Sequence, residues 1–194
     1  MPSRRLVLAS ASPARLGLLR GAGFDPQVHV SGVDESTVTG TPSEQVLELA
    51  RRKAGAVAPA HPDAVVIGCD SMLELDGRAL GKPTDAADAM GRWQQMRGRS
   101  GTLLTGHCVV DGDRCVAEVA ATVVHFGSPT DAEVHAYVAS GEPLHVAGAF
   151  TLDGRSGPFV DGIDGCHSNV VGLSLPLLRR LLQQLDVEVV DLWS

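Results

Sequence analysis

Lysine is the residue that this chain almost lacks. Of its 16 basic residues only Lys53 and Lys82 are lysines, and the others are arginines. A lysine is a compact point charge on a flexible stem, so these two positions stand out as candidates for contact with an anion. The formal net charge of −7 disfavours a general nucleic-acid binder, which needs a basic surface. A polyanionic ligand must therefore be held by a local basic pocket or by metal ions.

Features of membrane, zinc-binding and serine-hydrolase proteins are missing as well. The hydrophobic runs fall short of the roughly 20 residues that span a bilayer, and the apolar piece at 6–9 is too short for a signal peptide. The four cysteines form no C-x-x-C pair and have no histidine at zinc-finger spacing. No G-x-S-x-G occurs, which weighs against a hydrolase triad. We expect a cytoplasmic protein with reduced thiols and no membrane association.

Predicted strands and helices alternate along the chain. Apolar or alternating runs predict strands over 4–10, 25–33, 64–68, 102–111, 115–126 and 187–193. Capped, periodic segments predict helices over 13–21, 41–58, 84–97, 130–140 and 174–185. Asp-Gly pairs indicate turns at 76–77, within a hairpin over 72–81, and at 111–112, and 148–165 is rich in loops. This order predicts an α/β fold with a mixed central sheet flanked by helices, as a single domain over 1–194.

The first strand leads into a helix through the stretch SASPAR. Ser12 is a good N-cap, and Pro13 suits the first helical position. A helix N-terminus favours a phosphate, and the Ser10 and Ser12 hydroxyls add donors. Arg15 falls on the apolar side of this helix, where a surface arginine is not expected. The same pattern also fits an ordinary capped helix with a snorkelling arginine.

Lys53 lies within the apolar stripe of the helix over 41–58. Its neighbours on that stripe include Ala50 and Val57, whereas Glu48 and Arg52 point the other way. A lysine that faces inward must snorkel, meet a buried acid or reach the negative charge of a ligand. We favour the ligand.

Two acids and the second lysine follow predicted strands. Asp70 follows the apolar run 64–68 with only Cys69 between them, and ligands of α/β sheets bind beyond the carboxyl ends of strands. Glu35 holds a similar position, and both acids could instead belong to turns or caps. Lys82 lies in Gly-Lys-Pro-Thr, where Pro83 replaces the Ser or Thr of a P-loop. Lys82 is therefore expected to act from a loop.

Taken together, these segments resemble the Maf family of nucleoside triphosphate pyrophosphatases, which are also known as septum-formation inhibitor proteins. The shared motifs are SASPxRxxLL from Ser10, VDE at 33–35, Lys53-Ala54, Asp70, LGKP at 80–83, SGEP at 140–143, AGAF at 147–150 and NVVGLSLP at 169–176. The resemblance implies a mixed sheet, two lobes around a nucleotide cleft as in ITPase-like folds, and a homodimer. It also implies hydrolysis of NTP or dNTP to the monophosphate and pyrophosphate with Mg²⁺ or Mn²⁺, which clears non-standard or surplus nucleotides.

The resemblance assigns roles to individual positions. Asp70 matches the general base, and Glu35 and Asp70 match the metal-binding acids. The catalytic set is Asp70, Lys82, Lys53 and Glu35. The phosphate-binding set is Ser10, Ser12, Arg15, Lys53 and Lys82.

Several positions depart from the pattern of the family. Ala14 stands where many relatives have arginine, Ser71 where threonine is common, and Asp153 where glutamine is frequent. The resemblance places these three among the residues that select the base, so the preferred base stays open. His145 and Val146 replace an Asp-Lys pair.

A non-catalytic nucleotide-binding regulator of cell division or septum formation is the alternative. The substitutions at 145, 146 and 153 favour it because they erode the usual pocket. Retention of both lysines and both acids counts against it, because a sensor needs no base. Release of NMP and pyrophosphate from triphosphates would distinguish the two hypotheses.

Overall fold

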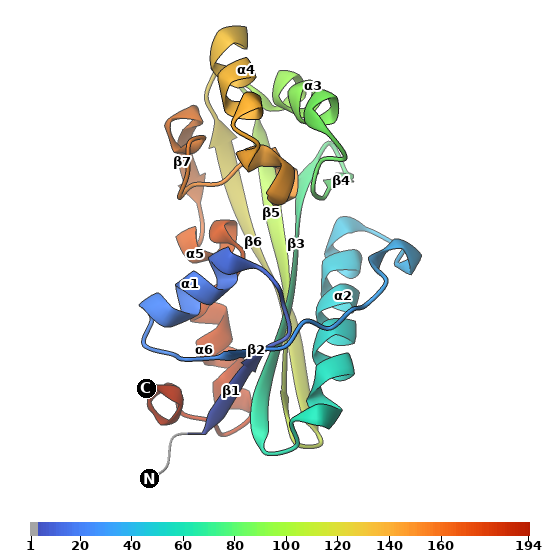
Figure 1. The fold of residues 1–194 in the computed structure, drawn as a ribbon, viewed down its shortest axis with the longest axis vertical. Helices are drawn as coiled ribbons and strands as arrows, with labels where there is room; N and C mark the ends of the chain where they lie inside the picture. The colour runs from blue at the N-terminus through green and yellow to red at the C-terminus, as the bar shows by residue number, and fades with distance from the viewer. Residues whose placement is uncertain (1–3) are drawn as a thin grey trace.

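A seven-stranded mixed sheet runs the length of the molecule (Figure 1). The computed structural model of the protein describes residues 4–194. The strand order is β2-β1-β3-β5-β6-β7, and β4 pairs with β3 beside this path. β1 is parallel to β2 and β3, whereas the other pairs are antiparallel. The predicted fold class, a mixed sheet flanked by helices, is confirmed.

The elements follow one another as strands with intervening helices. The strands are β1 (Arg5–Leu8), β2 (Gln27–Val28), β3 (Ala64–Leu75), β4 (Arg78–Leu80), β5 (Ser100–Asp111), β6 (Arg114–Phe126) and β7 (Val160–Asp164). The α-helices are α1 (Pro13–Gly21), α2 (Pro42–Val57), α3 (Ala86–Met96), α4 (Asp131–Ala139), α5 (His167–Val171) and α6 (Leu175–Gln184). Short 3-10 turns cover Glu35–Thr37, Ala58–Ala60, Glu142–His145, Ala147–Ala149, Gly157–Phe159 and Val189–Leu192. Among the described residues, no helix combines the length and hydrophobicity needed to cross a membrane.

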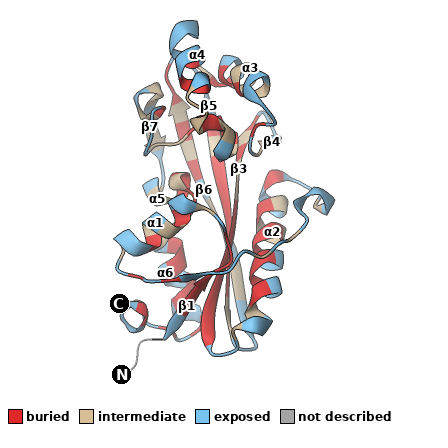
Figure 2. Cartoon of the chain, viewed as in Figure 1, coloured by how far each residue is buried: buried red, intermediate tan, exposed pale blue. Residues whose placement is uncertain are grey.

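The long strands β3, β5 and β6 connect two lobes, each with its own buried side chains (Figures 1 and 2). In the lower lobe, α2 covers one face of the sheet, and α1 and α6 cover the other. This arrangement buries the run 64–67 from both sides, as a continuously apolar strand predicts. In the upper lobe, Trp93 of α3 packs edge-on against both Phe126 at the end of β6 and Tyr137 of α4.

Two glycines bring α2 unusually close to the sheet. A Cβ atom on Gly68 of β3 would lie 2.3 Å from the Ala50 carbonyl oxygen, and one on Gly106 of β5 would lie 2.0 Å from that of Val46. Any other side chain at these positions would meet helix backbone, which cannot rotate away. The missing side chains therefore set the distance between α2 and β3.

Three sequence predictions about strands are wrong. Residues 187–193 form the 3-10 turn Val189–Leu192 and a single bridge from Trp193 to Phe24, not a strand. Only Gln27–Val28 of the predicted strand over 25–33 is a strand in the sheet. β7 lies within 148–165, which the sequence presents as a loop. In each case, whether a strand forms depends on a pairing partner far away in the sequence, and local alternation does not reveal whether that partner exists.

β3 is longer than the sequence predicts, and this changes the place of Asp70. The strand continues past residue 68 as far as Leu75, and the hairpin turn at 76–77 then leads into β4. Asp70 therefore lies inside a strand, opposite Gly106 of β5, and not at a strand's carboxyl end. The strand that does end here is β1, whose last residue, Leu8, pairs with Ile67. Polar side chains are tolerated at 70 and 71 because they face a cavity beyond the end of β1.

Substitution of Gly106 by alanine should destabilise the protein. We expect Gly106→Ala to lower the free energy of unfolding by about 1–3 kcal/mol or more, because the added methyl group overpacks against the backbone of α2. Gly55→Ala on the open side of the same helix meets nothing within 4 Å and should raise it by about 0.5–1 kcal/mol. Urea unfolding of the two variants measures both changes, and equal effects would contradict the close approach of α2.

Candidate active site

A cavity of about 880 Å³ opens between the two lobes, next to the end of β1. Its lower wall is the loop from β1 to α1, and one side is formed by residues 30–35 and α2. Its upper wall comes from the loop after β4 and from residues 145–151, and 170–172 close the remaining side. The cavity is large enough for a nucleotide-sized ligand.

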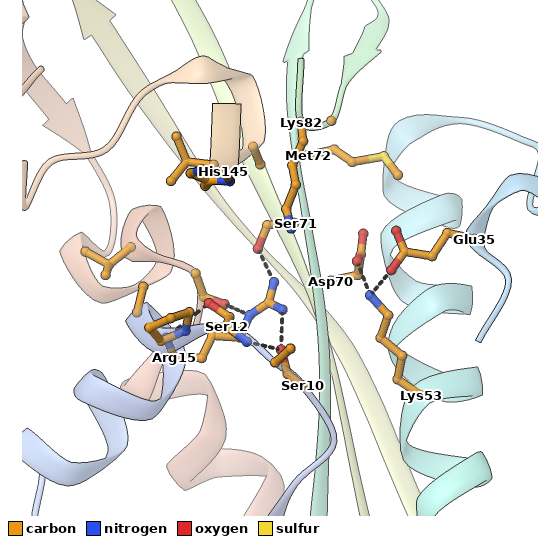
Figure 3. A pocket seen from close by; sticks show the side chains of 18 of the residues that line it. Ser10, Ser12, Arg15, Glu35, Lys53, Asp70, Ser71, Met72, Lys82 and His145 are labelled. Carbon is orange, nitrogen blue, oxygen red and sulfur yellow. Dashed lines mark hydrogen bonds and ion pairs between the residues drawn. The ribbon is translucent and has the colours of Figure 1, made fainter. Parts of the chain in front are cut away.

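Arg15 is held by three hydrogen bonds on the floor of this cavity (Figure 3). Its Nε donates to the Gly172 carbonyl at 2.8 Å, its Nη1 to Ser10 Oγ at 3.1 Å and its Nη2 to Ser71 Oγ at 3.0 Å. A guanidinium carries five N–H groups, so two of them have no bond in this set. Ser12 caps α1, because its Oγ accepts from the Arg15 backbone N–H at 3.4 Å. The predicted inward position of Arg15 is confirmed.

Ser71 connects Arg15 to the opposite strand. Its Oγ lies 2.9 Å from Thr105 Oγ1 on β5, and this hydroxyl donates to the Asn169 carbonyl at 3.4 Å. If Ser71 donates to Thr105, each hydroxyl gives one hydrogen bond and receives one. The orientation of the guanidinium then depends on β3, β5 and α5 together.

Lys53 lies between two carboxylates (Figure 3). Its Nζ is 2.6 Å from Asp70 Oδ1 and 2.6 Å from Glu35 Oε1. The side chains of Lys53 and Asp70 are only 11% and 10% exposed, whereas that of Glu35 is 57% exposed. Of the three roles open to an inward lysine, the structure assigns the ion pair with a buried acid, at the wall of the cavity.

Burial decides the protonation behaviour of Asp70. Loss of hydration raises the pKa of its carboxyl group above the ordinary value. The charges of Lys53 and Arg15 oppose this effect without reversing it, and the charge of Glu35 adds to it. A carboxylate with a raised pKa is a better proton acceptor than a solvated one. Asp70 Oδ1 bonds Lys53, so Oδ2 is the oxygen that remains for a proton.

Lys82 reaches the cavity from the upper lobe. It follows β4 in an exposed loop, and its side chain extends into the cavity (Figure 3). The cavity thus brings together all the residues that the sequence predicts for catalysis and phosphate binding.

The three positions predicted to select a base separate in space. Ala14 and Ser71 line the cavity, and Ser71 is already bonded to Arg15. Asp153 is not among the lining residues, and its Oδ1 lies 3.3 Å from His167 Nε2. The lining does include His145.

Sequence reasoning missed the contacts that hold the predicted residues in place. Thr105 is fully buried, but nothing in the strand pattern distinguishes it from a core residue. The Gly172 carbonyl that accepts from Arg15 is 157 positions away in the chain, and no sequence signal marks a backbone acceptor.

The two carboxylates are a suitable donor set for a divalent metal ion. Glu35 and Asp70 already converge on one cation, the ammonium of Lys53. Among the described residues, no group of three or more His, Cys, Asp or Glu side chains could hold a metal ion. Mg²⁺ often binds one or two carboxylates and takes its other ligands from substrate phosphates and water. Glu35 and Asp70 fit a metal ion of this kind that arrives with a phosphorylated ligand.

The fold is α/β, and its cavity is lined by two lysines, one arginine and two acids. The chain belongs to the Maf family, because the family model for Maf-like protein matches residues 5–185. A similar protein from Streptomyces coelicolor is 66% identical over 100% of this chain and 96% of its own length. One from Salinispora tropica is 57% identical over 98% and 88%, respectively. Both are named nucleoside triphosphate pyrophosphatase.

A solved structure supports the fold. The Ham1 protein of Staphylococcus aureus aligns with a TM-score of 0.51 over 93% of this chain and 98% of its own. At 16% sequence identity this likeness shows the fold alone.

The raised pKa of Asp70 predicts how its removal changes stability with pH. In the absence of metal and nucleotide, the folded protein binds this proton more tightly than the unfolded chain does. Stability from this group is therefore complete below the ordinary aspartate pKa of about 4 and is lost as the pH rises through the folded-state pKa. Asp70→Asn removes this loss. Urea unfolding should show the variant gaining free energy of unfolding relative to the natural protein as the pH increases across that window.

Asp34 provides a control of opposite sign. Hydrogen bonds from the Ser36 hydroxyl and backbone N–H lower the pKa of Asp34, so its contribution is present above the ordinary pKa and is lost as the pH falls. Asp34→Asn should therefore lose stability relative to the natural protein as the pH increases. The same trend in both variants would contradict the environment assigned to Asp70.

Proposed function

We propose that this protein hydrolyses nucleoside or deoxynucleoside triphosphates to the monophosphate and pyrophosphate. One observation carries the proposal: a buried Lys53–Asp70 pair shares a cavity with the bonded guanidinium of Arg15. A phosphate tail needs cationic donors, and its hydrolysis by water needs a base, and here both groups face the same volume. The names of the relatives from Streptomyces coelicolor and Salinispora tropica support the same reaction.

In the proposed mechanism, Asp70 activates a water molecule. The water oxygen attacks the α-phosphorus while a proton moves to Asp70 Oδ2, and the bond between the α-phosphorus and the bridging oxygen breaks. Pyrophosphate leaves with the electron pair of that bond. Lys53 holds Asp70 Oδ1 in place, and its charge keeps the raised pKa of Asp70 from rising further.

Cationic groups surround the proposed path of the phosphate tail. The two N–H groups of Arg15 that are free of its three hydrogen bonds are donors for phosphate oxygens, as are the Ser10 and Ser12 hydroxyls on the floor. Lys82 offsets charge from the upper wall, on the departing pyrophosphate. Because these groups come from both lobes, a triphosphate that spans the cavity satisfies all of them at once.

A divalent ion, Mg²⁺ or Mn²⁺, would be held by Glu35 and Asp70. When bound it neutralises phosphate charge and polarises the phosphoryl oxygens. Lys53 already sits within 2.6 Å of both acids, so its ammonium must share them with the incoming ion. The homodimer and the cytoplasmic location predicted above belong to this proposal as well, as does base selection by Ala14, Ser71 and Asp153.

Loss of the Asp70 carboxylate should lower turnover strongly. With a panel of triphosphates and Mg²⁺ or Mn²⁺, the natural protein should release NMP and pyrophosphate. We expect Asp70→Asn to lower kcat by about 10²–10⁴-fold, the usual contribution of a positioned base. Asp76→Asn, which makes the same change in the exposed turn between β3 and β4, is the matched control and should keep full activity.

Other results would redirect the assignment. Release of NDP and orthophosphate would indicate a phosphatase. Nucleotide binding without any hydrolysis would favour the non-catalytic regulator. Full turnover in Asp70→Asn would remove Asp70 as the base.

A further inference from the structure

α3 holds two segments of the upper cavity wall through consecutive residues. The Trp93 indole N–H donates to the Ala149 carbonyl at 2.9 Å, which fixes the turn Ala147–Ala149. Arg92 donates from Nη1 to the Gly81 carbonyl at 2.6 Å, on the loop that carries Lys82. The same Gly81 carbonyl accepts from the Gly148 N–H at 2.9 Å. The Lys82 loop and this turn are therefore joined to each other and to α3.

The guanidinium of Arg92 is used almost completely. Its Nε and Nη2 bond the two oxygens of Asp88, one helical turn earlier, at 3.0 Å and 2.7 Å. Its Nη2 also reaches the Lys82 carbonyl at 3.3 Å. Asp88 Oδ2 accepts in turn from the Thr84 N–H at 2.9 Å. The Asp88–Arg92 pair thus bonds the backbone of the loop before, at and after Lys82.

The Asp88–Arg92 pair is partly buried and held by several hydrogen bonds, unlike an ordinary surface ion pair. The Arg92 side chain is only 12% exposed, whereas the loop residue Lys82 is exposed. Hydrogen bonds from Arg92 and Thr84 lower the pKa of the Asp88 carboxyl, so Asp88 is ionised at neutral pH and the bidentate geometry is available there. Loops move more than the elements they connect, and the pair ties the backbone of this loop at three residues.

We propose that Arg92 is a positioning residue that acts through Lys82. It touches no reacting atom, and it fixes the loop backbone so that the Lys82 ammonium enters the cavity in one place. The inference rests on the proposed function, in which Lys82 meets the pyrophosphate end of the substrate. The planar fork is essential, because a lysine at 92 would keep the charge but could not serve the Asp88 carboxylate and two carbonyls together.

The test compares Arg92→Lys with Lys82→Ala and with the double variant. Pyrophosphate is the probe, both as a competitive inhibitor and as a product. We expect Arg92→Lys to lower kcat/KM by on the order of tenfold and to weaken pyrophosphate inhibition by on the order of tenfold. Misplacement of a binding group by about 1 Å can cost about 100-fold, and a partly held loop should cost less. The double variant should match Lys82→Ala alone, because a lysine that is absent cannot be misplaced.

Arg97 supplies the matched control. It also belongs to the α3 region, and it also bonds an aspartate and a backbone carbonyl, Asp131 Oδ1 at 2.6 Å and Pro129 O at 3.4 Å. Pro129 is not among the cavity-lining residues, whereas Gly81 and Lys82, whose carbonyls Arg92 bonds, both are. Arg97→Lys should change neither parameter by more than about twofold. Asp88→Asn, which weakens the same pair from its other side, should shift pyrophosphate inhibition in the direction of Arg92→Lys and serves if that variant does not fold.

Two outcomes would overturn the inference. One is that Arg92→Lys lowers kcat/KM and weakens pyrophosphate inhibition in the Lys82→Ala protein by the same factors as in the natural protein. The other is an Arg92→Lys protein that behaves like Arg97→Lys. Failure of the proposed function is a separate result, because the natural protein would then release no pyrophosphate from any triphosphate.

Discussion

The sharing of one ammonium by two carboxylates is the interaction on which the candidate site depends. Lys53 meets Asp70 and Glu35 at equal distances of 2.6 Å. Burial by itself disfavours the charged form of an acid or an amine, and pairing the two offsets part of that cost. The ion pair places an acid and an amine side by side where both side chains are almost fully shielded from water. The exposed side of Glu35 leaves the cluster open toward the cavity.

The close approach of the α2 backbone to the sheet brings Lys53 near Asp70. α2 lies almost against β3 and β5 because residues 68 and 106 have no side chains. The apolar stripe of α2, which contains Ala50 and Ala54, is small for the same reason. The small residues that allow this close packing also bring the side chain of Lys53 to the cavity.

Much of the site was predictable because its charged residues violate a local pattern. Lys53 on an apolar stripe and Arg15 on an apolar helix side need only the helical period to be noticed. The fold class follows in the same way from alternating strands and helices. The length of β3, the edge strand β7 and the 3-10 turn near residue 190 were not predictable, because tertiary pairing decides them. The ties of Arg92 to the Lys82 loop escape for a similar reason: the spacing of Asp88 and Arg92 indicates a helical ion pair, but not its backbone partners.

β3, β5 and β6 run without interruption from one lobe into the other. The two walls of the cavity are consequently not separate bodies joined by a linker. Any change in their spacing requires the shared strands to twist or bend, and the backbone hydrogen bonds of the β3–β5 and β5–β6 ladders resist such a deformation. We therefore expect a ligand to enter and leave through movement of rim segments that lack such ties, and not through a change in the spacing of the two lobes.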